Sequence, residues 1–327
     1  HMLAEAAAHG VTHAAMEASS HGIDQRRLDG VRLVAGGFTN LTQDHLDYHG
    51  TMGAYRAAKL RLFETLTPTG ATAVLNADSD AYEAFAGAAV TAGQTVMSVG
   101  EAGQGLALLA RAPTPGGQDL KIAAGGQTYD VHLPLVGAYQ ASNALVAAGL
   151  CIAAGEEAGA VLKALETLEG APGRLQRVGT SAKGGEAYVD YAHTPDGLET
   201  VLKALRPHVT GKLIVVFGCG GDRDRTKRPI MGRIAADLAD VAIVTDDNPR
   251  TELPAAIRAE VMTGARGAKE IGDRRTAIRA GVAMLEAGDV LVVAGKGHEQ
   301  YQIIGEVTHH FDDVAETVEA LAEAGRG

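Results

Sequence analysis

Side chains able to hold a cation or a phosphate gather between Glu17 and Lys59. Val31 to Phe38 is apolar apart from one arginine and two glycines, which predicts a mostly buried strand, and a polar stretch follows it directly. Open α/β sheets bind their ligands at the carboxyl ends of such strands. Carboxylate, hydroxyl and amide oxygens suit hard cations, so the stretch predicts a cation and phosphate site. The same residue types also form ordinary turns and helix caps, and this alternative stays open here.

Glu17 and Lys59 lie at the two ends of this stretch. Glu17 follows an apolar run, Val11 to Met16, that we predict to be a strand. The side chain of Glu17 would then point into the crevice at the carboxyl ends of the strands. Lys59 lies in a predicted helix over residues 55–63. A lysine amine reacts with carbon dioxide only when neutral, and burial or nearby cations disfavour its charged form. The carbamate would supply a carboxylate on a long stem; a solvated helix lysine is the alternative.

A repeating strand–helix pattern occupies the second half of the chain. We predict strands at Ala187–Asp190, Leu213–Phe217, Val241–Thr245 and Val290–Val293, and helices near residues 196–206, 228–239, 253–264, 274–286 and 313–324. This alternation is typical of a doubly wound parallel sheet. Each strand is followed by a polar motif, at the edge where an open sheet forms its site.

Two of these motifs favour binding of an anion. The glycine-rich segment 218–228 carries Arg223 among acidic neighbours, and its glycines let a ligand approach the backbone closely. Asp246-Asp247-Asn248-Pro249-Arg250 follows the next strand. An arginine can donate two parallel hydrogen bonds to a carboxylate. A capping Asp or Asn beside an unrelated arginine is the alternative.

The composition is that of a globular α/β protein. The 327 residues are 46% hydrophobic and 21% charged, which is enough chain for two domains. A net charge of −11 argues against binding to nucleic acid or an anionic membrane. The sequence contains no run of about 18 apolar residues, so it predicts no membrane-spanning helix. Cys151 and Cys219 lack C-x-x-C spacing, which argues against zinc and disulfides and fits a reducing cytoplasm.

Taken in order, these motifs resemble those of the Mur ligases, the ATP-dependent amide-forming enzymes of peptidoglycan synthesis. The resemblance covers nearly the whole chain and is strongest to the branch that adds the third residue to UDP-N-acetylmuramoyl-L-alanyl-D-glutamate. It implies a central ATPase-like domain at residues 1–172 and a C-terminal Rossmann-like, amino-acid-binding domain at 173–327, divided at the Gly/Pro break 170–173. It also implies a cytoplasmic monomer that uses ATP and Mg²⁺.

The resemblance implies roles for individual residues of both domains. Magnesium would be held by Glu17, His45 and a carbamylated Lys59. The muramoyl-peptide substrate would contact Ser19, Gln25 and Arg27. ATP would contact Asn143, Arg174, His193 and Asp190. His193 would lie near the phosphates, with Asp190 orienting it.

The pentapeptide ending at Arg250 resembles the version that selects meso-diaminopimelate. This amino acid carries an extra carboxylate at its far end, which an arginine can clamp, whereas a lysine acceptor would present only an ammonium and be repelled. The acceptor would meet Asp247 in this loop. Its distal carboxylate would contact Arg223, Asn248 and Arg250, and its distal amino end would contact Gly295 and Glu299.

The predicted reaction joins diaminopimelate to the D-glutamate side-chain carboxylate through an acyl phosphate. We find no G-x-x-x-x-G-K-[ST] phosphate loop. We therefore expect a fragment that lacks this loop and the UDP-binding domain, and that is inactive alone. The alternatives are a related ligase with another acceptor such as lysine, or a non-catalytic module that binds an amino acid or a nucleotide.

Overall fold

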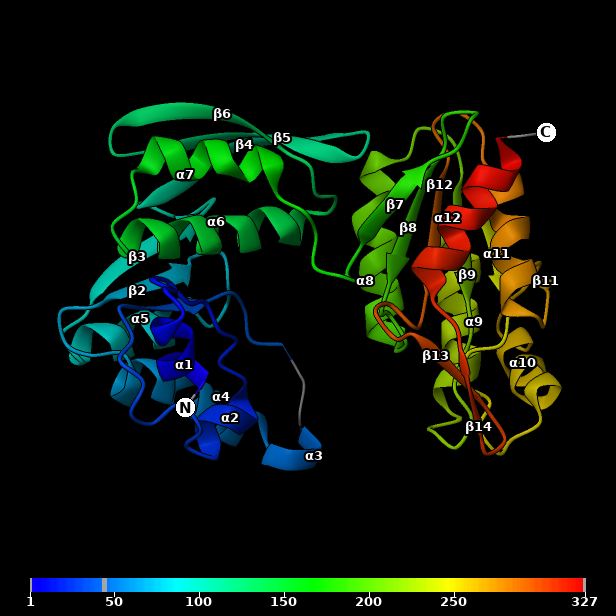
Figure 1. Cartoon of the computed structure of the whole chain (residues 1–327), viewed down its shortest axis with the longest axis horizontal. Helices are drawn as coiled ribbons and strands as arrows, with labels where there is room; N and C mark the ends of the chain where they lie inside the picture. The colour runs from blue at the N-terminus through cyan, green and yellow to red at the C-terminus, as the bar shows by residue number, and fades with distance from the viewer. Residues whose placement is uncertain (1, 43–45, 326–327) are drawn as a thin grey trace. The chain divides into compact units, whose positions relative to one another are not determined.

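A computed structural model describes residues 2–42 and 46–325 of the chain (Figure 1). The chain divides into two compact units. The first unit comprises His1–Leu109, Ile122–Tyr129 and Ser142–Leu162, and the second comprises Ala110–Lys121, Asp130–Ala141 and Lys163–Gly327. The domain boundary at residue 172 stays a prediction.

The first unit contains three parallel strands covered by helices. The strands are β1 (Ala35–Phe38), β2 (Thr72–Asn76) and β3 (Thr95–Gly100). The helices of this unit are α1 (Met2–Ala8), α2 (Ser20–Asp24), α3 (Leu46–His49), α4 (Met52–Arg61), the π-helical turn η1 (Leu62–Leu66), α5 (Tyr82–Thr91) and most of α6 (Ala138–Ala153). Phe38 stacks on Phe85 with ring centroids 3.8 Å apart, and Phe63 meets the same ring edge-on.

Small residues let α6 lie close to this sheet. A Cβ on Gly149 would come within 2.5 Å of a methyl group of Val74, and one on Gly37 within 2.9 Å of Leu150. Three further strands continue the sheet in the order β1-β2-β3-β4-β5-β6. They are β4 (Leu106–Thr114), β5 (Gly117–Ala124) and β6 (Gln127–Leu133), and two-residue links join them into hairpins. The short helices α7 (Ala158–Ala164) and η2 (Leu165–Thr167) follow α6.

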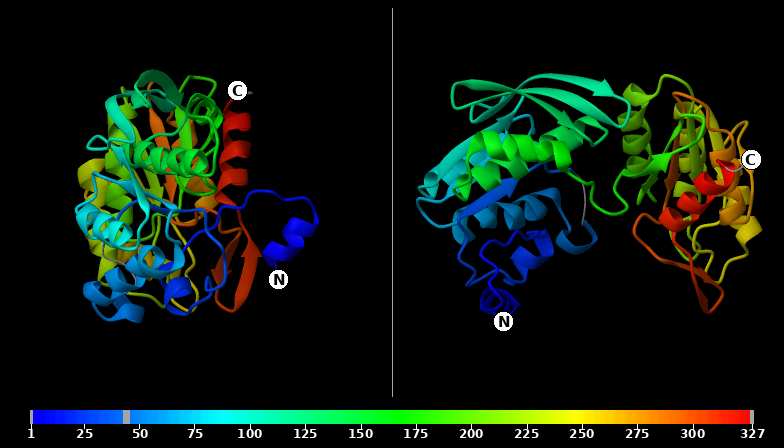
Figure 2. Two further views of the ribbon diagram at one scale, coloured as in Figure 1. Left: turned by 90° about the vertical axis from the view of Figure 1, so that its left-hand side faces the viewer. Right: turned by 45° about the horizontal axis from the view of Figure 1, so that its top comes forward.

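The second unit contains a six-stranded sheet in the order β11-β10-β9-β12-β8-β7. Its parallel strands are β8 (Glu186–Asp190), β9 (Leu213–Phe217), β10 (Val241–Val244), β11 (Lys269–Glu270) and β12 (Val290–Ala294). At one edge β7 (Gln176–Thr180) runs antiparallel to β8. The hairpin β13 (Tyr301–Ile304) and β14 (Val307–His310) projects beyond the sheet (Figure 2).

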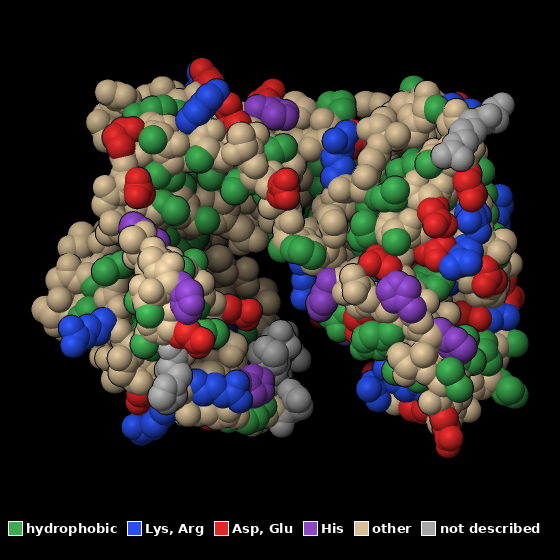
Figure 3. All heavy atoms as spheres, viewed as in Figure 1, with side chains coloured by type: hydrophobic (Ala, Val, Ile, Leu, Met, Phe, Trp, Pro, Cys, Tyr) green, Lys and Arg blue, Asp and Glu red, His purple; other side chains and the backbone are tan. Residues whose placement is uncertain are grey.

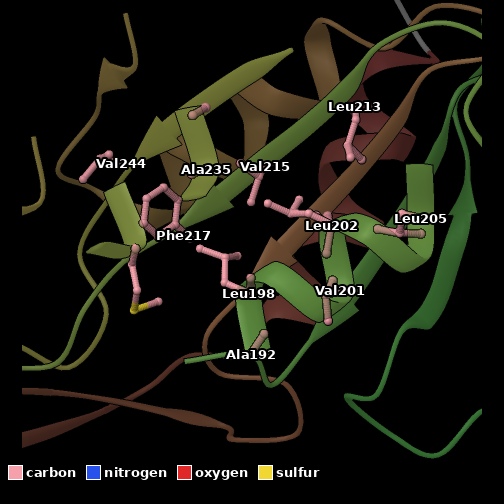
Figure 4. Close-up of a cluster of buried hydrophobic side chains, with 14 of the residues drawn as sticks. Ala192, Leu198, Val201, Leu202, Leu205, Leu213, Val215, Phe217, Ala235 and Val244 are labelled. Atoms are coloured by element: carbon pink, nitrogen blue, oxygen red, sulfur yellow. The ribbon is translucent and has the colours of Figure 1, made fainter. Parts of the chain in front are cut away.

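Helices cover both faces of this second sheet. One face carries α8 (Pro195–Leu205), η3 (Arg206–His208), α9 (Lys227–Leu238) and α10 (Pro254–Met262), and the other carries α11 (Arg274–Ala283) and α12 (Asp313–Ala324). The apolar stripe of α8, including Leu198 and Leu202, packs on Val215 and Phe217 of β9 (Figure 4). Basic and acidic side chains lie side by side over α12 (Figure 3), including the pairs of Arg275 with Glu316 and Arg279 with Glu323.

Two expectations for the first half of the chain need correction. The strand expected from Val31 to Phe38 is confined to Ala35–Phe38, where β2 pairs with it. The strand expected from Val11 to Met16 is wrong: residues 11–19 adopt neither helix nor strand, and Val11 and Met16 are exposed. An apolar run forms a strand only where a neighbouring strand pairs with it and its side chains are covered. In the described part of the sheet, β1 is the last strand on that side.

Candidate functional site

The strand order of the second unit places a topological switch point between β9 and β12, and the carboxyl ends of these strands with the loops that leave them are called the crevice below. These strands are adjacent, but the chain leaves β9 toward α9 on one face and leaves β12 toward α12 on the other. Open α/β sheets bind ligands at such a switch point, outside the carboxyl ends of the strands. The polar motifs of this unit lie in the loops that leave β8, β9, β10 and β12, so they converge on the same end of the sheet.

Glycines let the loops after β9 and β10 lie against each other. A Cβ on Gly221 would overlap the carbonyl oxygen of Pro249, and one on Gly220 would lie 2.8 Å from Nη1 of Arg250. The backbone N–H of Gly221 donates to the carbonyl oxygen of Asn248 over 2.9 Å. The glycine-rich segment therefore serves first to dock the loop that carries Asn248 and Arg250.

Arg250 is held by its backbone and by its side chain. Its φ of +51° lies in the left-handed region, which costs energy for a residue with a side chain. Its N–H donates to Ile303 and its carbonyl accepts from Gly305, both in the β13–β14 hairpin. Its Nη1 donates to the Gly221 carbonyl over 2.8 Å. These bonds aim the guanidinium at the loop after β9.

Asn248 and Glu299 lie next to each other at the crevice. Asn248 is buried, and its Nδ2 donates to Oε2 of Glu299 over 3.3 Å. The hydroxyl of Tyr191, after β8, lies 3.4 Å from Oε1 of the same carboxylate. Both distances are long for hydrogen bonds to a carboxylate. Glu299 therefore retains the capacity to accept stronger bonds from an ammonium.

Gly295 brings the end of β12 against the acidic loop after β10. Its φ is +125°, and a Cβ there would lie 2.9 Å from Oδ2 of Asp247. Its N–H donates to the carbonyl of Asp190, which ties the end of β12 to the end of β8. Arg223, by contrast, is exposed, and its Nη1 donates to the carbonyl of Asp222.

Arg174 and Tyr191 stack beside the end of β8. The guanidinium carbon of Arg174 lies 4.9 Å from the ring centroid of Tyr191. The carboxylate of Asp190 accepts from the N–H groups of Leu175 and Ala192, at 2.7 and 2.8 Å. Burial raises the pKa of Asp190, although these two hydrogen bonds oppose the shift. Asp190 therefore fixes the bend that carries Arg174.

His193 turns one ring nitrogen back toward the chain. Its Nδ1 lies 2.8 Å from the carbonyl oxygen of Tyr191, which can only accept, so Nδ1 carries a proton. Nε2 is then the nitrogen that can meet a ligand. Donation from Nε2 to a phosphate oxygen requires the doubly protonated ring.

In the first unit the predicted residues lie around α2 and α4, which pack together. Ser19 caps α2, because its Oγ accepts from the N–H of Gly22 over 3.1 Å. Gln25 donates to the hydroxyl of Tyr48 over 3.4 Å. Arg27 and Glu17 are exposed. Lys59, on α4, is half-buried, with its Nζ 5.3 Å from the centroid of the Tyr55 ring.

Rings of histidine and tyrosine gather beside Lys59. The rings of His21 and Tyr48 are 4.1 Å apart, and His49 lies within 5.5 Å of both His21 and Tyr55. None of these four rings was predicted from the sequence to belong to the site, although all of them lie between Glu17 and Lys59. Among residues 2–42 and 46–325, no three His, Cys, Asp or Glu side chains are grouped closely enough to hold a metal ion.

Comparison with known proteins decides the family. Residues 1–151 match the family described as the Mur ligase middle domain, and residues 173–297 match the Mur ligase glutamate ligase domain. The chain belongs to the Mur ligase family.

Relatives and solved structures extend this assignment. A protein of Caulobacter vibrioides named UDP-N-acetylmuramoyl-L-alanyl-D-glutamate–2,6-diaminopimelate ligase is 72% identical over 98% of this chain and 66% of its own length. One of Brucella melitensis with the same name is 56% identical, with the same coverage. A solved structure of such a ligase matches 98% of this chain and 66% of its own, with a TM-score of 0.76 and 39% identity. The chain thus spans 66% of the length of these relatives.

The fold is shared more widely. A folylpolyglutamate synthase of Mycobacterium tuberculosis matches with a TM-score of 0.61 at 22% identity, covering 91% of this chain and 65% of its own. The described part of this Mur ligase chain contains no helix long and apolar enough to cross a membrane.

The structure of this Mur ligase chain groups some predicted residues and leaves others apart. Those at the crevice of the second unit are Asp247, Asn248, Arg250, Gly295 and Glu299. Arg174, Asp190 and His193 adjoin one another at the end of β8. Arg223 lies on the exposed part of its loop, and Asn143 is half-buried on α6. His45 lies outside the described residues.

The burial of three cations of this Mur ligase chain was not predicted. Lys296 bonds to the side chain of Asn248, Arg274 to the carbonyls of Ala294 and Asp246, and Arg228 to the carbonyl of Gly220. Each therefore supports a loop at the crevice from beneath. Lysine and arginine are seldom fully buried unless paired, and their sequence neighbours give little sign of it. The two glycines flanking Lys296 were the available signal, because they permit close packing around it.

Proposed function

We propose that the chain is the diaminopimelate-binding part of a ligase that joins meso-diaminopimelate to UDP-N-acetylmuramoyl-L-alanyl-D-glutamate. The observation that carries the proposal is that Asn248 lies between an arginine and a carboxylate: Nη1 of Arg250 is 3.5 Å from its carbonyl oxygen, and its side-chain amide donates to Glu299. Arg250 and Asn248 offer donors suited to a carboxylate, and Glu299 offers an acceptor suited to an ammonium. The far end of diaminopimelate carries both groups on one carbon.

The names of the relatives support the same acceptor. Proteins 72% and 56% identical to this chain are named 2,6-diaminopimelate ligases. A lysine acceptor would leave the arginine of the crevice without a carboxylate and would bring an ammonium toward it, which costs affinity.

For the reaction, we propose that ATP phosphorylates the D-glutamate side-chain carboxylate and that the acceptor amine displaces phosphate. Arg174 and His193 would contact the nucleotide, as would Asn143. Ser19, Gln25 and Arg27 would meet the muramoyl-peptide. The protein's contribution is positioning and electrostatic stabilisation, so no side-chain nucleophile takes part.

We propose that magnesium binds through oxygen donors of the first unit. Glu17 is exposed, so its carboxylate is accessible, but an amine on Lys59 is a poor ligand for a hard cation. Carbamylation of Lys59 would supply the oxygens, and His45 would complete the set. Bound magnesium would neutralise charge on the transferring phosphoryl group. Intact-mass measurement under native conditions tests the modification: a mass larger by one carbon dioxide, absent in K59A, is expected.

Isothermal calorimetry of this chain with meso-diaminopimelate and with L-lysine tests the acceptor. We expect heat of binding from diaminopimelate, none from lysine at the same concentration, and a loss of about tenfold or more in affinity for R250A. Equal affinity for both amino acids, or an unchanged affinity in R250A, would overturn the proposed specificity.

We also propose that the protein acts as a cytoplasmic monomer, with its domain boundary at residue 172.

A further inference from the structure

Lys296 is fully buried between the crevice and the β13–β14 hairpin. Its Nζ lies 2.8 Å from Oδ1 of Asn248, 2.8 Å from the carbonyl oxygen of Tyr301 and 3.5 Å from Oδ1 of Asp247. An ammonium has three N–H donors, and three oxygens surround this one. Burial lowers the pKa of Lys296, whereas the carboxylate of Asp247 opposes the shift.

These contacts decide which way the Asn248 amide points. Its Oδ1 accepts from Lys296 and also from the backbone N–H of Ile303 over 3.0 Å. The opposite orientation would turn the NH₂ group toward two donors. With the oxygen held, Nδ2 must face Glu299, which is where it lies. One buried cation thus fixes the orientation of the amide that faces Glu299.

We propose that Lys296 is a positioning residue for the acceptor amino acid. It holds the Asn248 amide in the orientation that presents Nδ2 to the crevice. Since Lys296 is fully buried, it acts through Asn248 and does not touch the acceptor. The proposal rests on the proposed function, because the acceptor must bind beside Asn248 and Glu299.

Replacing Lys296 by methionine removes the charge and the hydrogen bonds with little change in side-chain volume. Calorimetry of the whole chain with meso-diaminopimelate is expected to show a loss of about tenfold or more for K296M. The matched control is K203M, since Lys203 is an exposed lysine on α8 paired with Glu199. Circular dichroism and thermal unfolding establish that each variant is folded. If K296M does not fold, K296Q, which keeps a donor for the Tyr301 carbonyl, replaces it.

A double-mutant cycle separates positioning from a general structural role. In the N248A background, K296M is expected to cost less than about twofold in affinity, because the group through which Lys296 acts is already gone. An equal loss in both backgrounds would overturn the proposal, as would wild-type affinity in K296M. If the unaltered chain does not bind diaminopimelate, the proposed acceptor fails, and the inference fails with it. Binding by the unaltered chain with an additive cycle overturns the inference alone.

Discussion

The buried pair of Arg274 and Asp313 gives a sharp prediction about stability. Both side chains have 0% exposure, and Nε and Nη2 of the arginine donate to the two carboxylate oxygens at 2.7 and 2.6 Å. The substitution D313N keeps the shape of the side chain and removes its charge. Arg274 would then be a buried cation without its hydrogen-bonded counter-charge.

The size of the effect follows from burial. Removing one partner of a buried pair costs about 3–5 kcal/mol of unfolding free energy, because the remaining charge has lost both water and its partner. The exposed pair of Lys203 and Glu199, with 62% and 42% exposure, is worth only about 0.3–0.5 kcal/mol. We therefore expect D313N to be destabilised several times more than E199Q.

Urea unfolding followed by circular dichroism measures both variants. The double variant R274M/D313N is expected to recover a large part of the loss, because a neutral pair of similar volume no longer buries an uncompensated charge. A D313N protein within about 1 kcal/mol of wild type, or a double variant with additive losses, would refute the reasoning that the pair's attraction offsets its desolvation.

Three further outcomes are expected. In urea unfolding, G221A should lose about 1–3 kcal/mol of unfolding free energy, because a Cβ there overlaps a backbone carbonyl oxygen. G87A should gain about 0.5–1 kcal/mol, because Gly87 is an exposed helix position with open space around it, and equal effects of the two substitutions would contradict this reasoning. At pH 8, iodoacetamide should label the exposed Cys151 and spare Cys219, because burial raises the pKa of Cys219 to about 12. Mass spectrometry of the protein labelled with and without denaturant checks this selectivity, and rapid labelling of Cys219 in the native protein would refute it. A hydrogen bond from the buried Arg228 lowers the pKa of Glu252 from 4.5 to about 2. The stabilising contribution of Glu252 is therefore present above pH 4.5 and is lost as the pH falls toward 2. E252Q should flatten that part of the acid-unfolding curve, and an unchanged slope would count against this prediction.

The parallel strands could be predicted from the sequence because burial on both faces leaves continuous apolar runs. Leu213–Phe217 and Val290–Ala294 are apolar throughout and entirely buried. The edge strand β7 was missed, since Gln176–Thr180 is half-exposed and has no such run. The hairpin β13–β14 was missed for the same reason, because all of β14 is exposed.

The candidate site was predictable where loop residues follow a recognisable strand. Asn248, Arg250 and Glu299 could be placed at one edge of the sheet because parallel strands end together. Their support could not be predicted, because Lys296 and Arg274 look like surface residues in the sequence and are buried only by elements distant along the chain. The bond from Arg250 to the β13–β14 hairpin likewise depends on a strand pairing that the local sequence does not reveal.

Because the three cations beneath the crevice are sealed from solvent, dissolved ions cannot gather around them. Counter-ion screening weakens charges that face water over about 8–10 Å near physiological ionic strength, and it acts much less on buried pairs. The exposed arginine–glutamate pairs along α12 should therefore weaken as salt is added, while the loops held by Arg228, Arg274 and Lys296 keep their shape. Salt would then act on the acceptor at the crevice through the acceptor's own charges, without loosening the loops that receive it.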